Sequence, residues 1–493
     1  MNTKKILFVT VIIATMLILS CDNIFSKPES QGKLENNHLT REEEIALMHL
    51  EEDYSGFIKS PDELTGLVQE RLDSATRSEH YQQLVISKTE SFSKTFERGF
   101  KTQKGEIRTS EVRFYLYTLI DPEAEEGQQP GFALMCDDVR IGNFIAMMPQ
   151  GDWNDPDNSF LVMYRASLDG YIQKTIDTFN HTAEADIKAA QEKLTQLEQN
   201  ARFVLYWDHG KHTSFGGNLI NTRWNGVGKG TTGGVPYNWA VDYNVNPNPI
   251  PNQSATPLLP QYAVGCDVVA LAQLVAYHEW FINNNGDNAP YSSIKSPHPY
   301  GTIQNDRTYF YYPHTGLYTT TPEQQYFADI DYFDWAGMKA DVIASNIHLD
   351  FKLQVTTLIF QIGCLMGKEF GSEGGSLTPI ELVLNALWEL GYASFGIQSS
   401  TNGDNFLTAT GIMRSLNEKK PVYASGVPSH SGMGTVATAW LMDGYKIVMA
   451  GYARTILVHC ILENGYDGEF NFGIFGNDIY DMKYITGVYP PAK

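Results

Sequence analysis

The chain has 493 residues, of which 42% are hydrophobic and 19% charged, and its formal net charge is −21. This length and composition provide for two or three domains with large cores and exclude a mainly disordered protein. The acidic balance argues against a nucleic-acid partner, which would require a basic face. Five scattered cysteines fit neither a disulfide framework nor a Cys-rich zinc site, and we expect neither a metal nor a cofactor.

The first twenty residues have the order of a secretory signal. Two lysines precede an apolar run over residues 6–19, and a small residue then precedes Cys21. This junction resembles a bacterial lipobox, in which the cysteine becomes the lipid-bearing N-terminus. We therefore expect residues 1–20 to be a signal peptide and Cys21 to be lipidated. The protein would then be exported and membrane-anchored, in the periplasm or at the cell surface. A plain signal peptide or a transmembrane anchor is the alternative, although about 14 apolar residues are few for a span.

Residues 21–39 are polar and aperiodic, and we expect them to form a tether with a reach of about 25 Å. The segment 40–204 is predicted to be an α+β unit. Its helix starts are two capping boxes, at Thr40 and Ser60. Apolar spacing predicts a helix ending near Asn200. Its predicted strands are rich in β-branched, aromatic and other apolar residues and cover 112–120, 131–136 and 143–148.

Residues 205–493 have a different composition and are predicted to be a second α+β domain. Gly, Asn and Pro dominate residues 208–260, so turns are expected there. A buried helix is predicted over 266–282, and a capped helix over 379–390. Short β runs separated by turn residues then follow, at 421–425, 436–442, 445–450, 455–462 and 470–474. Helices followed by antiparallel strands indicate the α+β class.

Cys266 follows a glycine at the predicted start of the apolar helix. The free N–H groups and partial positive charge of a helix N-terminus favour thiolate over thiol, so this cysteine is a candidate nucleophile. The alternative is a small buried residue at a helix start.

The segment GCDVVALAQLVAYHEW, residues 265–280, resembles the nucleophile segment of the streptopain family of cysteine peptidases. Further segments are similar to that family in the same order, at 131–153, 222–225, 236–238, 370–372, 421–423 and 439–445. The resemblance implies a papain-like peptidase domain over 205–493, preceded by an inhibitory prodomain over 40–204. It also implies a peptide or protein in the cleft as substrate or ligand.

The family's machinery is a Cys nucleophile, a His base, a Gln oxyanion donor and an Asn/Trp pair that orients the His. The resemblance assigns the nucleophile to Cys266. Thr438 stands at the position of the His, and Gly226 at that of the Gln. Asn464 lies in a turn that departs from the Asn-Trp pattern. Asp267 adds a negative charge that opposes thiolate formation. The active site therefore looks degraded.

Two functions remain open. One is a pseudopeptidase that keeps the fold, the cleft and the prodomain but is catalytically impaired. The other is an active thiol endopeptidase with a relocated base, either His459 or His430. His278 is excluded as that base because it lies 12 residues along the helix from Cys266, about 18 Å away.

Overall fold

The computed structural model describes the chain in segments, namely 39–51, 54–74, 84–123, 129–199, 213–215, 219–220, 265–283, short pieces between 303 and 319 and between 358 and 366, 377–399, 405–429, 437–450, 453–462, 466–475 and 480–489. Several of the expected features lie outside these residues: the signal peptide, Cys21, the 204/205 boundary, Gly226, His430 and Asn464. Among the described residues, no helix is both long enough and apolar enough to cross a membrane.

The N-terminal part, residues 39–199, begins with the two predicted capping boxes. In the first, Thr40 Oγ1 accepts a hydrogen bond from Glu43 N at 3.2 Å, and the Glu43 carboxylate accepts one from Thr40 N at 2.6 Å. Ser60 and Glu63 repeat this arrangement at the second helix. The elements are α3 (Arg41–Met48), η2 (Tyr54–Phe57), α4 (Pro61–Ser74), β1 (Val85–Phe96), β2 (Ser110–Ile120), β3 (Gly131–Cys136), β4 (Phe144–Met148), α5 (Ser159–His181) and α6 (Glu184–Gln199).

The C-terminal part, residues 265–489, contains the predicted buried helix and the predicted strands. Its longer elements are α8 (Cys266–Asn283), α12 (Ile380–Glu389), α13 (Asn405–Asn417), β11 (Val422–Pro428), β12 (Thr438–Ala450), β13 (Ala453–Ile461), β14 (Asp467–Asn471), η3 (Phe472–Phe475) and β15 (Tyr480–Ile485). The short strands are β5 (Thr213–Phe215), β6 (Ile303–Gln304), β7 (Arg307–Thr308), β8 (Phe310–Tyr312), β9 (Leu317–Thr319) and β10 (Ile397–Ser399).

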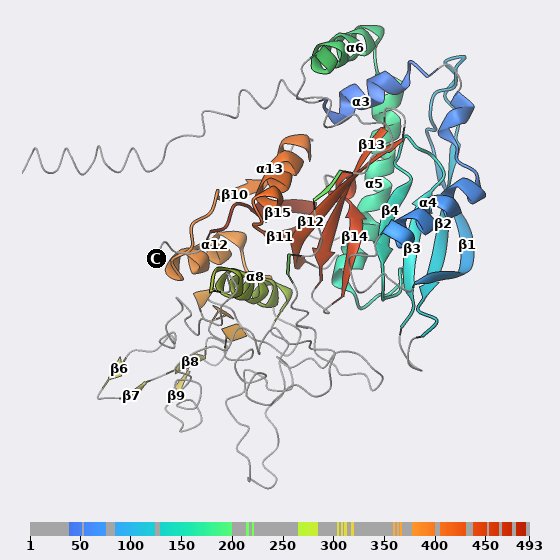
Figure 1. Cartoon of the computed structure of the whole chain (residues 1–493). Coiled ribbons are helices and arrows are strands. Elements are labelled where there is room, and N and C mark those ends of the chain that lie inside the picture. The colour runs from blue at the N-terminus through green and yellow to red at the C-terminus, as the bar shows by residue number, and fades with distance from the viewer. Residues whose placement is uncertain are drawn as a thin grey trace, which may run out of the picture.

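One antiparallel sheet runs through both parts (Figure 1). Its strand order is β1-β2-β3-β4-β14-β13-β12-β11-β15-β10, and β5 pairs with β12. The parts join where β4 meets β14, with Met147 opposite Glu469 and Ala146 opposite Phe470. The N-terminal strands therefore extend the sheet of the C-terminal part.

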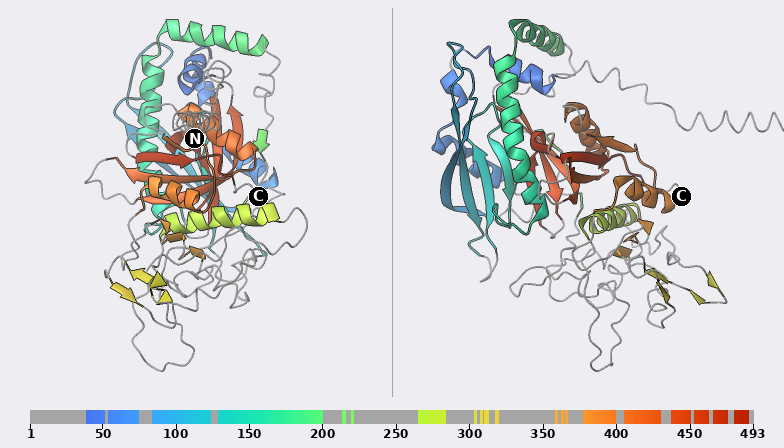
Figure 2. Two further views of the ribbon diagram at one scale, coloured as in Figure 1. Left: turned by 90° about the vertical axis from the view of Figure 1, so that its left-hand side faces the viewer. Right: turned by 180° about the vertical axis from the view of Figure 1, so that it is seen from behind.

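The two faces of β12 pack against different helices, as expected from the two-residue period of a strand. Trp440 and Met442 belong to the hydrophobic core that includes α5. Ala439 and Leu441 belong to the core around α8. The sheet is consequently covered by α5 on one face and by α8 on the other (Figures 1 and 2).

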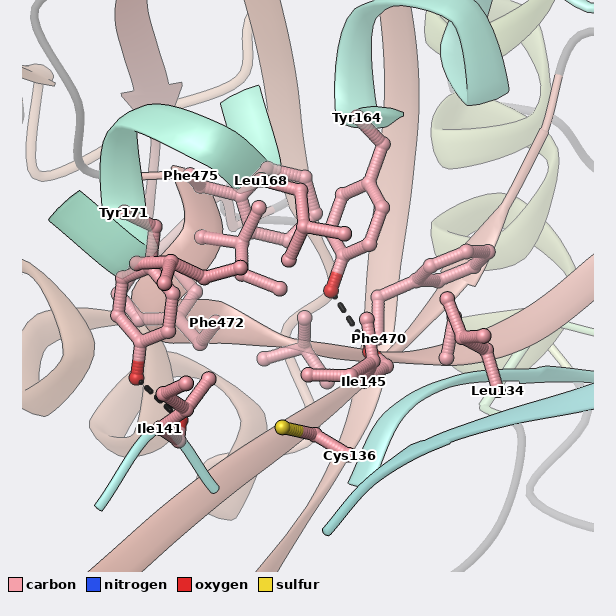
Figure 3. Packing of buried hydrophobic residues seen from close by; sticks show 14 of the residues in the cluster. Leu134, Cys136, Ile141, Ile145, Tyr164, Leu168, Tyr171, Phe470, Phe472 and Phe475 are labelled. Atoms are coloured by element: carbon pink, nitrogen blue, oxygen red, sulfur yellow. Dashed lines mark hydrogen bonds between the residues drawn. The ribbon is translucent and has the colours of Figure 1, made fainter. Parts of the chain in front are cut away.

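The core on the α5 face is built from both parts of the chain. Figure 3 shows Tyr164 of α5 beside Phe470 and Phe475, with ring centroids 5.2 and 5.3 Å apart. The Tyr164 hydroxyl donates to Ile145 O at 2.7 Å, and the Tyr171 hydroxyl donates to Ile141 O at 2.8 Å. Each fully buried aromatic side chain contributes about 2 kcal/mol of transfer free energy. The N-terminal part therefore supplies much of this core.

Two of the predicted strand boundaries were wrong. The runs 436–442 and 445–450 are one strand, β12, because the register shift between Met442 and Gly444 is a bulge and not a turn. The last predicted run, 470–474, is the end of β14 followed by the 3-10 helix η3.

Candidate active site

Cys266 lies at the N-terminus of α8, as the sequence predicts. Gly265 has φ of +92°, a left-handed conformation that favours glycine, and turns the chain into the helix. The cysteine is 8% exposed, and the N–H of Ala439 donates a hydrogen bond to its Sγ at 3.2 Å. The thiol therefore faces the start of β12.

Thr438 is the first residue of β12 and immediately precedes that donor. Its side chain is fully buried, and Thr438 Oγ1 accepts a hydrogen bond from Ser159 Oγ at 3.3 Å. Ser159 is the first residue of α5. The backbone of Thr438 thus adjoins the Cys266 contact, while its hydroxyl points to the α5 face. A threonine hydroxyl cannot hold a proton at neutral pH as an imidazole does.

Asp267, the acidic neighbour of the cysteine, is fully buried. One of its carboxylate oxygens accepts a hydrogen bond from Val268 N at 3.0 Å, and the other accepts one from Thr378 N at 2.7 Å. The side chain thereby joins the start of α8 to the residues that precede α12. Its position next to Cys266 keeps a carboxylate beside the thiol, which disfavours a thiolate.

His459, one of the two proposed relocated bases, is buried between two carboxylates. Its Nδ1 lies 2.5 Å from Asp443 Oδ1, and its Nε2 lies 3.1 Å from Asp467 Oδ2. Burial opposes a charged ring, but the attraction of Asp443 and the hydrogen bonds to both carboxylates raise the pKa of His459 to about 10. Both nitrogens therefore carry a proton at neutral pH, and the ring has no free lone pair.

The position of His459 also separates it from the thiol. It pairs with Gly444 across β12 and β13, whereas Cys266 contacts Ala439. That offset along the strand amounts to roughly 15 Å. His459 is therefore too far from Cys266 to act as its base, which removes one of the two relocated bases that the alternative function offered. The bulge residue Asp443 also accepts a hydrogen bond from Ile220 N at 3.0 Å, so the cluster ties β12 to a preceding segment.

The other described histidines are also distant from the thiol. His278 lies about 18 Å along α8, and burial lowers its pKa to about 3. His49 stacks on Phe179, and His181 ends α5, so both lie about 30 Å along that helix from Ser159. Of the four histidines within the described segments, none reaches Cys266. His430, the second proposed base, lies outside them.

Ser159 is a residue at this site that the sequence analysis does not identify. Asn158 Oδ1 accepts a hydrogen bond from Leu161 N at 3.0 Å and caps α5, which places Ser159 against Thr438. An asparagine cap followed by apolar residues at helical spacing is the signal that predicts such a helix start.

The remaining cysteines with a described position are structural. Cys136 and Cys460 are free and fully buried, and burial raises the pKa of both thiols well above the ordinary value. Cys364 lies outside the described residues. Within the part of the chain that the structure describes, no group of three or more His, Cys, Asp or Glu side chains could hold a metal ion.

Residues 233–472 match the model of the peptidase C10 family. No curated protein matches the chain. Among solved structures, the chain is similar to a mutant fragment of prointerpain A from Prevotella intermedia, with 13% identity over 81% of this chain and 100% of that one and a TM-score of 0.45. It is also similar to the active interpain A cysteine protease of the same organism, with 17% identity over 55% of this chain and 94% of that one and a TM-score of 0.35.

The family match covers the helix that begins with Cys266 and the strands β11 to β14. It agrees with the predicted α+β fold class and with a papain-like peptidase domain in the C-terminal part. Over residues 233–472, the chain is therefore a homologue of the cysteine peptidases of the C10, or streptopain, family.

Proposed function

We propose that this protein is an exported, lipid-anchored member of the family that binds peptides or a protein partner in its cleft and hydrolyses them slowly or not at all. The observation that carries this proposal is the hydrogen bond from Ala439 N to Cys266 Sγ, because the residue before that donor is Thr438. The resemblance assigns the general base to this position, and a threonine has no basic nitrogen.

The missing base affects two steps of thiol hydrolysis. Without an imidazole partner, a thiol keeps a pKa near 8.5, so only a few per cent is thiolate at pH 7. The leaving amine also has to be protonated, which Thr438 cannot do. The N-terminus of α8 favours the thiolate, whereas the adjacent Asp267 opposes it. Loss of an oxyanion donor, as the resemblance implies at Gly226, costs roughly 10²–10³ in rate in other enzymes.

The activity test uses the chain from residue 22, which keeps every described element. We expect no casein hydrolysis above that of the Cys266→Ala variant. We also expect iodoacetamide to label Cys266 with a midpoint near or above pH 8, read by mass spectrometry over pH 5–9. A midpoint below about pH 6, with casein cleavage that Cys266→Ala abolishes, would overturn the proposal and point to a base such as His430.

The membrane anchor is tested separately. The proposal rests on the junction before Cys21, so Cys21→Ser is expected to release the protein from the membrane fraction or to block its maturation. If the variant is processed normally and still sediments with membranes, the lipid anchor is wrong. Neither result depends on the chemistry of Cys266.

A further inference from the structure

We propose that residues 39–199 are a permanent part of the folded protein and not a removable prodomain. The two parts would stay associated, and fold together, even when the chain between them is cut. This association does not depend on whether Cys266 hydrolyses peptides.

The apolar side of this contact is a shared core and not a docking surface. Phe160 of α5 lies 5.1 Å from Trp440, 4.7 Å from Phe470 and 5.9 Å from Phe475 between ring centroids. Trp440 and Phe475 are fully buried, and Figure 3 shows side chains of both parts interleaved in this region. Removing α5 would expose this aromatic face of β12, β14 and η3 to water. Soluble monomers rarely carry so large an apolar patch.

Backbone hydrogen bonds of the sheet also connect the two parts. β4 pairs with β14 as an interior neighbour, so release of the N-terminal part would leave β14 as an open edge. An unpaired edge strand beside exposed aromatic residues is a site of aggregation. The C-terminal part is therefore not expected to be stable alone.

Two buried ion pairs connect the two parts, and the charges are arranged in opposite directions in the two pairs. Arg71 of α4 forms two hydrogen bonds with the Glu469 carboxylate of β14, one of them from Nε at 2.7 Å. Glu44 of α3 pairs with Arg454 of β13, with Nε 2.8 Å from Oε1. The N-terminal part supplies the cation in the first pair and the anion in the second.

Both pairs are withdrawn from water. Glu44 is 2% exposed and Glu469 is 7% exposed. Burial opposes ionisation of both carboxylates: it raises the pKa of Glu44 in spite of Arg454 and Arg41, whereas the Arg71 guanidinium lowers the pKa of Glu469. The Arg454 guanidinium also donates to Leu39 O at 3.3 Å. Because a buried charge that loses its partner is costly, the two ion pairs favour this one arrangement of the two parts. The shared hydrophobic core holds the parts together.

The test inserts a recognition site for a specific protease after Asn200 in the chain from residue 22. After complete cutting, we expect both fragments to co-elute in gel filtration at about 0.1 µM and to unfold in urea in a single transition. Elution of a separate N-terminal fragment, with a C-terminal fragment that stays monomeric and keeps its own cooperative transition, would overturn the proposal.

Substitutions test the assigned contacts. Arg71→Ala in the cut protein should raise the dissociation constant of the fragments by roughly 10²-fold or more. Arg71→Glu combined with Glu469→Arg should recover part of that loss. Lys59→Ala is the matched control, since it removes an exposed pair with Glu63 inside the N-terminal part and should leave the dissociation constant unchanged. Equal effects of Arg71→Ala and Lys59→Ala would refute the role of the buried pair.

Discussion

Cys266 and Thr438 are neighbours in space, yet their side chains lie on opposite faces of β12. Cys266 packs with Ala439 in the core around α8, whereas the Thr438 hydroxyl contacts Ser159 on the α5 face. A side chain at position 438 would have to turn around the start of the strand to reach the sulfur. Restoring the chemistry of the family therefore needs more than a histidine at this position.

Thr438→His provides the direct test. Because position 438 is fully buried against α5, we expect the imidazole to destabilise the protein by about 1–3 kcal/mol through overpacking and not to restore casein hydrolysis. Urea unfolding and the casein assay measure the two effects. Ser159→Ala alone serves as the control for loss of the hydroxyl contact. Hydrolysis gained by Thr438→His alone would contradict this reading of the geometry.

His459 predicts a specific dependence of stability on pH. Its folded-state pKa is raised from 6.5 to about 10, so its contribution is fully present below about pH 6.5 and is lost as the pH rises toward 10. The free energy of unfolding should therefore fall by a few kcal/mol between pH 7 and 10. Lys446 has the opposite effect on the free energy of unfolding. Burial lowers its pKa to about 8, so its deprotonation stabilises the folded protein as the pH rises above that value.

The comparison of wild type with His459→Gln isolates the histidine from Lys446. The difference in unfolding free energy between the two proteins should be largest near pH 6 and shrink toward pH 10. A difference that does not change with pH would mean that the ring is neutral in the folded protein.

The strands of the N-terminal part show which parts of the fold a single sequence can predict. β2, β3 and the start of β4 were predicted within about two residues, because their apolar and β-branched residues mark them locally. β1 was not predicted, since most of its residues are exposed and it lacks the apolar alternation of a half-buried strand. The pairing of β4 with β14 is a contact between distant segments, which no local pattern encodes.

Among the helices, too, one was predicted from a local pattern and another was not. The apolar run from Cys266 predicts α8, and the position of the candidate nucleophile follows from it. α5 was missed although Asn158 caps it and Phe160, Tyr164 and Leu168 follow at helical spacing. Because α5 was not predicted, its first residue, Ser159, was not identified as part of the site. The partners of His459 could not be predicted either, because Asp443 reaches the ring through a bulge that the sequence analysis interpreted as a turn.

Gly468 tests how tightly β14 fits against β4. A Cβ at this position would lie 2.5 Å from Met148 Cγ and 2.7 Å from Met147 O, closer than atoms can approach. Gly468→Ala should therefore lower the free energy of unfolding by about 1–3 kcal/mol. Gly66→Ala, at an exposed position of α4 with open space around it, is the control and should be neutral or stabilising by up to about 1 kcal/mol. Equal destabilisation by both changes would show that the contact between β4 and β14 is loose.

The whole molecule should respond to proteases at the segment between its two parts. Limited proteolysis of the chain from residue 22 is expected to cut first between about Ala201 and Arg223, where turn-forming residues gather in the sequence. The strands from β1 to β4 should resist, because three of them are interior to the sheet. Mass spectrometry of the earliest fragments gives the sites, and first cuts within residues 112–149 would contradict the proposed division of the chain.

The strand order has a consequence for how the protein comes to be folded. β14 and β15 follow every other strand of this sheet in the sequence, yet both lie inside it, with β14 between β4 and β13 and β15 between β11 and β10. Arg71 can form its ion pair only after Glu469, which lies 398 positions later in the chain, has been synthesised. Such distant pairings carry a high contact order, which slows folding and prolongs the exposure of unpaired strands. Until β14 (Asp467–Asn471) has been synthesised, this sheet cannot close, and the aromatic residues of the shared core remain exposed to water.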